Sequence, residues 1–207
     1  MLALQEMQVK PMKNEMQGKL VLITGGARSG KSEFAENFMR AYTEKTAYIA
    51  TAEILDEEMN ERVFLHKQRR EAEFWLNLEA PYNAQAIIEQ IPAEVEGILF
   101  DCLTIYVCNL LYTKLDNLPF LQKVTIIKQE IAEIIKMCRK SGKLVVFVSN
   151  EIGLGIVPAN KMAREYRDVI GWINQQVAAE CEHVFLTVCG QALDIKKMAF
   201  KLPNQED

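Results

Sequence analysis

Residues 25–32 read GGARSGKS and match the phosphate-binding pattern G-x-x-x-x-G-K-[ST] at every fixed position. They directly follow the apolar run Leu20–Thr24 and precede a helical stretch, the order of strand, loop and helix that this motif needs. The backbone N–H groups of such a loop surround phosphate oxygens, and the N-terminus of the next helix adds positive potential. We expect Lys31 to contact the β- and γ-phosphates and the Ser32 hydroxyl to hold Mg²⁺. The sequence therefore predicts that the chain binds a nucleoside triphosphate.

The length and net charge of the chain limit the kinds of protein that it can be. A chain of 207 residues suits one domain with a substantial core. A net charge of −4 and a pI near 5.4 argue against a protein whose main task is to coat nucleic acid. No apolar stretch approaches the roughly 20 residues of a membrane span. We therefore expect no nucleic-acid partner and no membrane span.

The N-terminal segment and the cysteines bear on location. Residues 1–18 lack the apolar core of a signal peptide and are interpreted as a mobile or loosely docked extension. Residues 19–207 are interpreted as one catalytic domain in the cytoplasm. Five cysteines without a C-x-x-C pair suit a reducing compartment and indicate no zinc site. Four of them lie in apolar segments and are predicted to be buried, namely Cys102, Cys108, Cys138 and Cys189.

Continuous apolar runs alternate with amphipathic stretches along the chain. The runs predicted as strands are Leu20–Thr24, Thr46–Ala50, Gly97–Asp101, Lys143–Ser149 and His183–Cys189. The stretches predicted as helices are 32–43, 56–70, 83–90, 103–114, 119–141 and 160–180. Apolar strands separated by helices are typical of a parallel sheet covered on both faces. The expected fold is a single α/β domain of the RecA-like P-loop NTPase type, with a mostly parallel sheet and helices on both faces.

A second feature that bears on phosphate chemistry is Asp101, which ends the apolar run Ile98-Leu99-Phe100. Because the ends of parallel strands meet at one edge of the sheet, Asp101 is predicted to bind Mg²⁺ opposite Ser32, directly or through water. The alternative is that Asp101 caps the helix expected near Leu103.

The segment 56–70 begins acidic and ends basic around His66. Arg62, Arg69 and Arg70 lie three or four residues from His66, and nearby cations disfavour the imidazolium form. A neutral histidine beside a bound triphosphate can attack phosphorus and form a covalent intermediate. The same composition also suits a solvated basic helix end with an incidental histidine. Spacing alone does not decide between them.

Residues 149–158 follow a predicted strand and contain two glycines and a proline, which indicates a shaped loop at the ligand-binding edge. In the following helix, Arg164, Asp168 and Gly171 share one face. They either form a binding surface, on which Gly171 permits close approach of a ligand or backbone, or Arg164 and Asp168 form an ordinary surface ion pair. His183 is interpreted as structural.

Taken together, these motifs resemble one enzyme family. The chain is similar, from about residue 19 to 196, to the bifunctional adenosylcobinamide kinase / adenosylcobinamide-phosphate guanylyltransferases of cobalamin assembly. Besides the phosphate loop, the resemblance lies in residues 48–52 (YIATA), 56–70 with His66-Lys67, 101–104 (DCLT) leading to 109–111 (NLL), 150–158, and 163–168 (AREYRD) through Gly171 to 174–175 (NQ).

The resemblance implies two reactions that use ATP or GTP. A nucleoside triphosphate first phosphorylates the aminopropanol hydroxyl of adenosylcobinamide. GMP then passes from GTP to a histidine and on to the new phosphate, which gives adenosylcobinamide-GDP. It also implies a homo-oligomer, with trimers, and an acceptor corrinoid near the loop 150–158.

The expected site residues fall into three groups. The resemblance implies that His66 is the guanylylated nucleophile. From the phosphate-loop chemistry, Lys31 is the second catalytic residue, and Ser32 and Asp101 are the expected metal ligands. The implied nucleotide contacts are Gly25, Gly26, Ala27, Arg28, Ser29, Gly30, Lys31, Ser32, Ala50, Thr51, Ala52, Lys67, Gln68, Arg69, Arg70, Glu79 and Asp101.

Two other functions stay open on the sequence. The first is a P-loop small-molecule kinase without nucleotidyl transfer, in which His66 only helps to bind phosphate. The second is a nucleotide-driven motor or nucleic-acid-handling ATPase. A Glu beside the strand-end Asp101 would favour the motor, but Cys102 follows it. The acidic pI also disfavours it.

Overall fold

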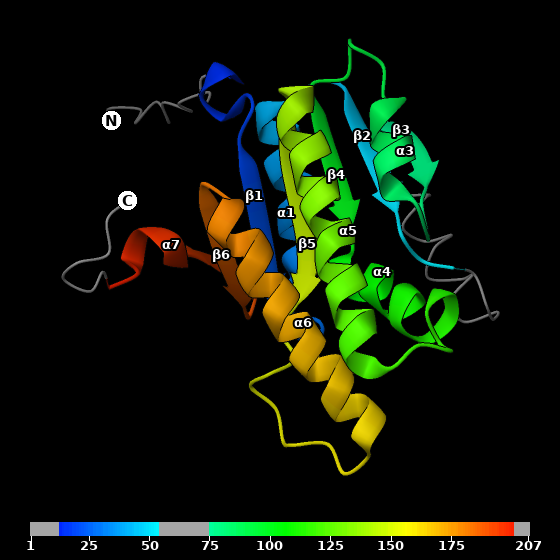
Figure 1. Cartoon of the computed structure of the whole chain (residues 1–207). Helices are drawn as coiled ribbons and strands as arrows, with labels where there is room; N and C mark the ends of the chain where they lie inside the picture. The colour runs from blue at the N-terminus through cyan, green and yellow to red at the C-terminus, as the bar shows by residue number, and fades with distance from the viewer. Residues whose placement is uncertain (1–12, 54–74, 201–207) are drawn as a thin grey trace, which may run out of the picture.

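The computed structural model describes residues 13–53 and 75–200. In Figure 1, one sheet stands at the centre with helices in front of it and behind it. The strands are β1 (Leu20–Gly25), β2 (Thr46–Ala50), β3 (Trp75–Glu79), β4 (Gly97–Asp101), β5 (Leu144–Asn150), β6 (His183–Val188) and β7 (Gln191–Asp194). The helices are the 3-10 helix η1 (Lys13–Met16), α1 (Lys31–Tyr42), α3 (Ala84–Glu89), α4 (Leu103–Asn109), the π-helical turn η2 (Leu110–Lys114), α5 (Phe120–Ser141), α6 (Lys161–Glu180) and α7 (Ile195–Met198).

The strand order within the described residues is β3-β2-β4-β5-β1-β6-β7. All neighbours run parallel except β6 and β7, which pair antiparallel. The parallel strands therefore end at one side of the sheet, here called the carboxyl edge, and begin at the opposite amino edge. Gly25 pairs with Asn150, and Ala50 pairs with Asp101, at the carboxyl edge. One strand, β5, separates β1 from β4, which is the RecA-like arrangement expected from the sequence.

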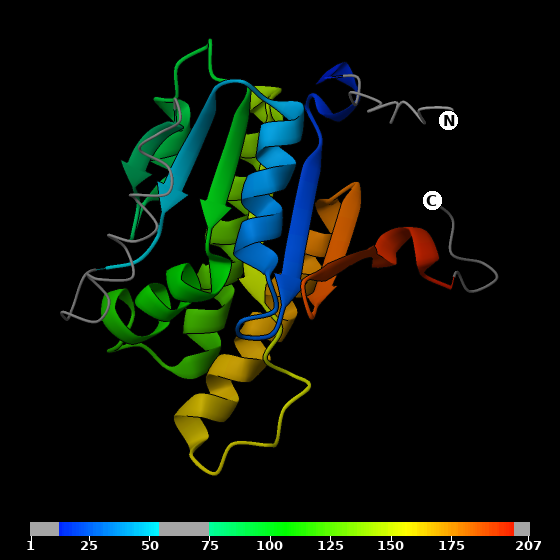
Figure 2. The ribbon, with the colours of Figure 1, turned by 180° about the vertical axis from the view of Figure 1, so that it is seen from behind.

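Helices cover both faces of the sheet, so the central strands are buried on both sides. Figure 1 shows α5 and α6 in front of the sheet, and the reverse view in Figure 2 shows α1 over the other face. In β1, Leu20 and Leu22 belong to the cluster under α3–α6, whereas Val21 and Ile23 belong to the cluster under α1. Burial on both faces explains why β1 and β5 are continuously apolar in sequence.

Most predicted elements are confirmed, with three differences. The edge strands β3 and β7 were not predicted, and the helix predicted over 103–114 divides into α4 and η2. Cys189 was predicted to be buried but is exposed, because it lies in the β6–β7 turn with a positive φ of 51°. Cys102 and Cys138 are buried, as predicted, and Cys108 is half-buried. The helix predicted over 56–70 lies outside the described residues.

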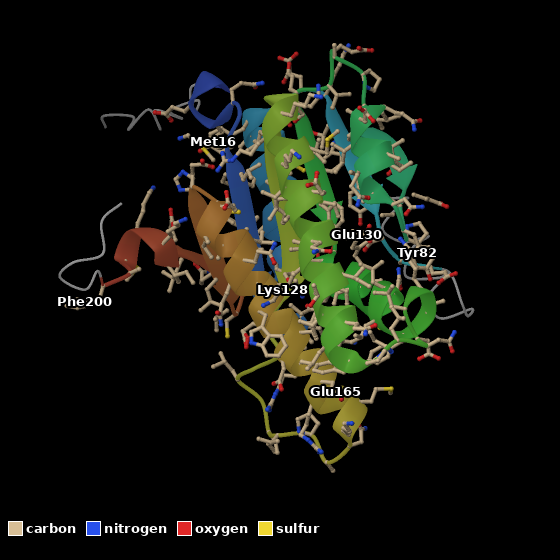
Figure 3. The ribbon with its side chains drawn as sticks, viewed as in Figure 1. Met16, Tyr82, Lys128, Glu130, Glu165 and Phe200 are labelled. Atoms are coloured by element: carbon tan, nitrogen blue, oxygen red, sulfur yellow. The ribbon has the colours of Figure 1, made fainter. Side chains whose placement is uncertain are left out.

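The end of the N-terminal segment packs on the domain. Met16 is buried in the cluster under α1, and Figure 3 shows it close to the start of β1. The Gln17 side-chain amide donates to the Gly142 carbonyl at 2.7 Å. No described helix combines the length and apolar character needed to cross a bilayer.

Candidate active site at the carboxyl edge

The phosphate loop joins the end of β1 to the start of α1, and two glycines account for its shape. A Cβ on Gly25 would lie 2.4 Å from the Thr187 hydroxyl oxygen and 2.6 Å from that of Ser29, so no side chain fits there. Gly30, at the N-cap of α1, has a φ of 94°, which is a left-handed conformation that favours glycine. The loop is thus a close-fitting backbone turn at the N-terminus of a 12-residue helix. Such a turn directs N–H groups at an anion.

Strand β6 supports this loop from the side. The Ser29 and Thr187 hydroxyls are hydrogen-bonded at 2.8 Å, and Thr187 donates to the Thr24 carbonyl at 3.1 Å. The Gly190 N–H donates to the Ser29 carbonyl at 2.9 Å. The β6–β7 turn therefore fixes the loop conformation. Thr187 was not singled out from the sequence, because a threonine in an apolar strand carries no local signal of this contact.

Lys31 and Ser32 occupy the first two positions of α1, where the helix dipole is positive. The Lys31 ammonium donates to the Gly26 carbonyl at 3.2 Å, so its side chain lies across the loop that would hold the phosphates. The predicted phosphate-binding stretch therefore runs from Gly25 at the end of β1, through the turn, to Lys31 and Ser32 at the start of α1, all at the carboxyl edge.

Asp101 ends β4 at the same edge. Its Oδ2 accepts a hydrogen bond from the Tyr48 hydroxyl at 3.0 Å. The alternative role of Asp101 as a helix cap is not observed, since the N-cap of α4 is Cys102 and no side chain caps it. Ser32 and Asp101 supply a hydroxyl and a carboxylate oxygen. These are the hard ligands that suit Mg²⁺, which keeps several waters and phosphate oxygens and rarely needs a protein cage. Within the described residues no group of three His, Cys, Asp or Glu side chains gathers as a metal site.

Thr51, an expected nucleotide contact, is fully buried and connects two strand ends. Its hydroxyl donates to the Cys102 carbonyl and accepts from the Cys102 N–H, both at 2.8 Å. The Asn109 amide donates to the Thr51 carbonyl at 2.8 Å and to the Pro81 carbonyl at 3.2 Å. The Thr51 side chain therefore positions the turn after Asp101. Ala50 and Ala52 on either side of it are half-buried.

Glu79 ends β3, pairs in register with Ala50 and is exposed at the carboxyl edge. The remaining expected site residues lie outside the described residues. These are the proposed nucleophile His66 and its neighbours Lys67, Gln68, Arg69 and Arg70.

A partly buried polar network, not predicted from the sequence, joins β5, α4 and α6 beside Asp101. The Asn150 amide donates to the Thr104 hydroxyl at 3.1 Å, and the Asn174 amide donates to the Asn150 carbonyl at 3.1 Å. The Thr104 hydroxyl also contacts the Cys102 thiol at 3.0 Å. Burial and the Asp101 carboxylate raise the pKa of the Cys102 thiol to about 11, even though Lys31 acts to lower it. Cys102 is therefore a neutral packing group at neutral pH.

The loop after β5 has a defined shape, as predicted. Arg164 of α6 binds this loop and not Asp168, the partner that the sequence suggested. Arg164 donates to the Pro158 and Ala159 carbonyls at 2.9 and 2.6 Å, so it closes the loop instead of pairing with Asp168. Asp168 lies 3.9 Å from Arg167. A Cβ at Gly171 would meet nothing within 4 Å among the described residues, so the space beside this glycine is open.

Comparison with known proteins identifies the family. Residues 21–195 match the CobU family, described as cobinamide kinase / cobinamide phosphate guanyltransferase. The bifunctional adenosylcobalamin biosynthesis protein CobU of Escherichia coli (strain K12) is 38% identical over 182 residues, which cover 86% of this chain and 99% of that protein. The chain belongs to this family. The corresponding CobP protein of Pseudomonas aeruginosa (strain PAO1) is 38% identical over 178 residues, 84% of this chain and 96% of its own.

Membership of the CobU family makes the chain an enzyme, a kinase and guanylyltransferase, as the sequence predicted. Among solved structures, the KaiC-like protein PH0186 of Pyrococcus horikoshii OT3 aligns with a TM-score of 0.47 and 13% identity, over 82% of this chain and 71% of its own. The RadB recombinase aligns with a TM-score of 0.47 and 14% identity, over 83% and 74%.

Proposed function

We propose that this CobU-family enzyme phosphorylates the aminopropanol hydroxyl of adenosylcobinamide and then attaches GMP to the new phosphate, through a covalent intermediate on His66. The observation that carries the proposal is the intact phosphate loop, held by Thr187 and Gly190, in a chain of this family. The phosphate loop without the family's other motifs would support nucleotide binding alone.

In the first reaction, the acceptor hydroxyl oxygen attacks the γ-phosphorus. The bond from that phosphorus to the β–γ bridging oxygen breaks, the nucleoside diphosphate leaves and the hydroxyl proton is released. The enzyme's contribution is position and charge. The loop N–H groups and Lys31 hold the phosphate oxygens on which negative charge develops. Tyr48 orients the Asp101 carboxylate through its hydrogen bond.

Ser32 and Asp101 would hold Mg²⁺, which supplies charge neutralisation at the phosphate oxygens. Their placement on the helix start and on the end of β4 supports this assignment.

In the second reaction, an imidazole nitrogen of His66 attacks the α-phosphorus of GTP and pyrophosphate leaves. A phosphate oxygen of adenosylcobinamide phosphate then attacks the same phosphorus, the phosphorus–nitrogen bond breaks and the imidazole is restored. Splitting the transfer in this way gives two in-line displacements. Both reactions need a site for a nucleoside triphosphate, so we propose that the one phosphate loop serves both.

Incubation with GTP labelled at the α-phosphate tests the histidine step. The expected result is Mg²⁺-dependent label on the wild-type protein that is stable to alkali and labile to acid, as a phosphoramidate is. The His66→Ala variant should take up no label while retaining phosphorylation of adenosylcobinamide. Wild-type protein that phosphorylates the acceptor yet takes up no label would leave a kinase without nucleotidyl transfer.

The cellular location, oligomeric state and domain bounds of the enzyme are part of the same proposal. We infer a cytoplasmic homo-oligomer, with trimers, in which residues 19–207 form the catalytic domain and residues 1–18 an extension. The family resemblance supports the oligomer, and the packing of Met16 supports a docked end to the extension.

A further inference from the structure

Thr187, near the end of β6, has a side chain that is 1% exposed and faces the phosphate loop. Its hydroxyl carries one proton, which it donates to the Thr24 carbonyl at 3.1 Å. The Thr187 oxygen must therefore accept the proton of the Ser29 hydroxyl, which lies 2.8 Å away. The Ser29 side chain, itself 8% exposed, thus directs its only proton at β6 and not at a phosphate oxygen.

The backbone of the phosphate loop also packs on β6 and on the turn after it. Gly25 pairs in register with Thr187, and a Cβ on Gly25 would lie 2.5 Å from the Thr187 carbonyl oxygen. A Cβ on Gly30 would lie 3.1 Å from the Cα of Gly190. Figure 2 shows β1 and β6 ending side by side at the carboxyl edge. Both ends of the phosphate loop therefore rest on the β6–β7 hairpin.

These contacts hold the loop in one shape before a nucleotide binds. Phosphate oxygens are bound by several loop N–H groups at once, so affinity depends on how much of the time the loop has that shape. When only a fraction of the protein is competent to bind, the apparent Kd rises by the inverse of that fraction. Loss of a contact between hairpin and loop is therefore expected to weaken nucleotide binding without removing any group that touches the nucleotide.

We propose that Thr187 is a positioning residue for nucleotide binding. Its hydroxyl acts through Ser29 and the Thr24 carbonyl, and keeps the phosphate loop in the conformation that binds a triphosphate. The inference rests on the proposed function in one respect, because Thr187 serves both reactions only if the one phosphate loop does.

A second buried threonine provides a matched control at the opposite edge of the sheet. Thr43, 8% exposed, donates to the Met39 carbonyl at 2.7 Å, so its oxygen accepts from the Thr46 hydroxyl at 2.8 Å. It makes the same two bonds as Thr187, one to a carbonyl and one to a hydroxyl. Thr43 follows the last residue of α1, about 18 Å from Lys31 at the helical rise of 1.5 Å per residue. Thr43→Val therefore loses the same bonds far from the phosphate loop.

The test compares Thr187→Val with Thr43→Val by calorimetric titration of a non-hydrolysable GTP analogue with Mg²⁺ present. Valine keeps the shape of threonine and replaces the hydroxyl with a methyl group. The Kd should rise about tenfold in Thr187→Val and stay within about twofold of the wild type in Thr43→Val. Both variants should lower the melting temperature. Thr187→Ser keeps the hydroxyl and should restore the affinity of the wild type.

Kinetics separate positioning from transfer. In Thr187→Val the KM for the nucleotide in the kinase reaction should rise about tenfold, with kcat close to that of the wild type, because saturating nucleotide restores the bound shape of the loop. The KM for the acceptor should be unchanged. Uptake of label from GTP labelled at the α-phosphate should need a correspondingly higher GTP concentration.

Ser29→Ala removes the other hydroxyl of the pair and provides a second test if Thr187→Val folds poorly. It should weaken binding of the analogue, and Ser29→Ala combined with Thr187→Val should bind less weakly than the product of the two single effects, since both remove one shared contact. Fully multiplicative effects would mean that the two hydroxyls act independently, and would overturn the inference.

An unchanged Kd in Thr187→Val, with a lowered melting temperature, would also overturn it, because the hydroxyl would then only stabilise the fold. Equal rises in Kd in Thr187→Val and Thr43→Val, or failure of Thr187→Ser to restore binding, would do the same. Failure of the proposed function is distinguishable. A wild-type protein that binds the analogue but takes up no α-phosphate label would defeat the histidine step, and the titrations would still decide the role of Thr187.

Discussion

Lys143 at the amino edge of the sheet and Lys31 at the carboxyl edge carry the same ammonium group in different surroundings. Lys143 is buried and donates to the carbonyls of Pro92, Ala93 and Val95, which ties the turn before β4 to the start of β5. Lys31 lies on the exposed phosphate loop, where its hydrogen bond to Gly26 crosses the expected phosphate position. The first ammonium closes the fold, and the second is directed at a ligand.

The same contrast holds for the groups around them. At the amino edge, charged side chains satisfy the backbone, as when Glu182 accepts from the Leu20 N–H at 2.7 Å and pairs with Arg139 at 2.6 Å. Around the phosphate turn and the end of β4, the neutral groups Thr187 and Asn109 hold the backbone, whereas the charged Arg164 holds the more distant loop after β5. Neutral hydrogen-bonding groups add no fixed charge beside a polyphosphate. Charged side chains therefore stabilise the backbone at the amino edge, whereas the backbone nearest the expected phosphate position is held by neutral ones.

The largest expected effect comes from Lys31→Ala. Loss of the ammonium removes the charge that stabilises the transferring phosphate, so phosphorylation should fall by about 10³-fold or more, equivalent to roughly 4 kcal/mol in the barrier. The melting temperature should change by less than about 2 °C, because alanine is a good helix former and the side chain is not buried. Steady-state kinetics and calorimetry check both values. If Lys31→Ala instead lost much stability and kept its activity, Lys31 would have the structural role that is assigned here to Lys143.

Lys143→Met should have the opposite effect: it should lower the stability of the fold while leaving kinase activity nearly unchanged. Burial lowers the pKa of the Lys143 ammonium, so desolvation opposes its hydrogen bonds to the three carbonyls. Removal of the ammonium leaves three carbonyls without this donor, for a net loss of about 1–2 kcal/mol of unfolding free energy. Denaturant unfolding measures that loss, and the kinase turnover of the folded variant should stay within about twofold of the wild type.

A matched control for Lys143→Met is Lys140→Met on the exposed end of α5. It changes the net charge equally without disturbing a buried donor. Equal effects of the two substitutions on unfolding would mean that the carbonyl contacts of Lys143 contribute nothing to stability.

Sequence patterns predicted the central sheet because burial on both faces makes β1, β4 and β5 apolar up to their carboxyl ends. The edge strands β3 and β7 lack this apolar pattern and were not predicted. Strand β3 has only half-buried and exposed positions, and β7 has four residues with the same character. An edge strand has one hydrogen-bonded neighbour and partial burial, so its sequence is close to that of a loop.

The candidate site divides in the same way. The phosphate loop and Asp101 were predicted because each directly ends a recognisable strand, and parallel topology brings strand ends together. The hydrogen bonds that hold the phosphate loop and the turn after Asp101 in place were not predicted. Ser29 and Thr187 are 158 positions apart, and Asn109 reaches Thr51 across 58 positions. One hydrogen bond over such a separation leaves no periodicity or local motif in a single sequence.

The smallest expected effect, and the one that depends on pH, is at Glu182 on the amino edge. Burial alone would raise the pKa of this carboxyl, but the Leu20 N–H and Arg139 overcome burial and hold its pKa below the ordinary value. A lowered pKa in the folded state means that this stabilisation is present at neutral pH. It is lost as the pH falls below about 4.5 and through the folded-state pKa, because the folded carboxyl must then be protonated.

Glu182→Gln removes the charge while keeping an oxygen that can accept from Leu20. Since more than a third of the Glu182 side chain is exposed, solvent screening limits the expected loss to about 0.5 kcal/mol at pH 7. The difference from the wild type should shrink towards zero as the pH is lowered below the ordinary glutamate pKa, as urea unfolding at a series of pH values would show. Glu133→Gln breaks the more exposed pair with Lys136 and should have a smaller effect at every pH. A loss of unfolding free energy in Glu182→Gln that grew on acidification would contradict the sign of the pKa shift. An equal loss in Glu133→Gln would mean that the Glu182 ion pair at the amino edge contributes no more than an ordinary surface pair.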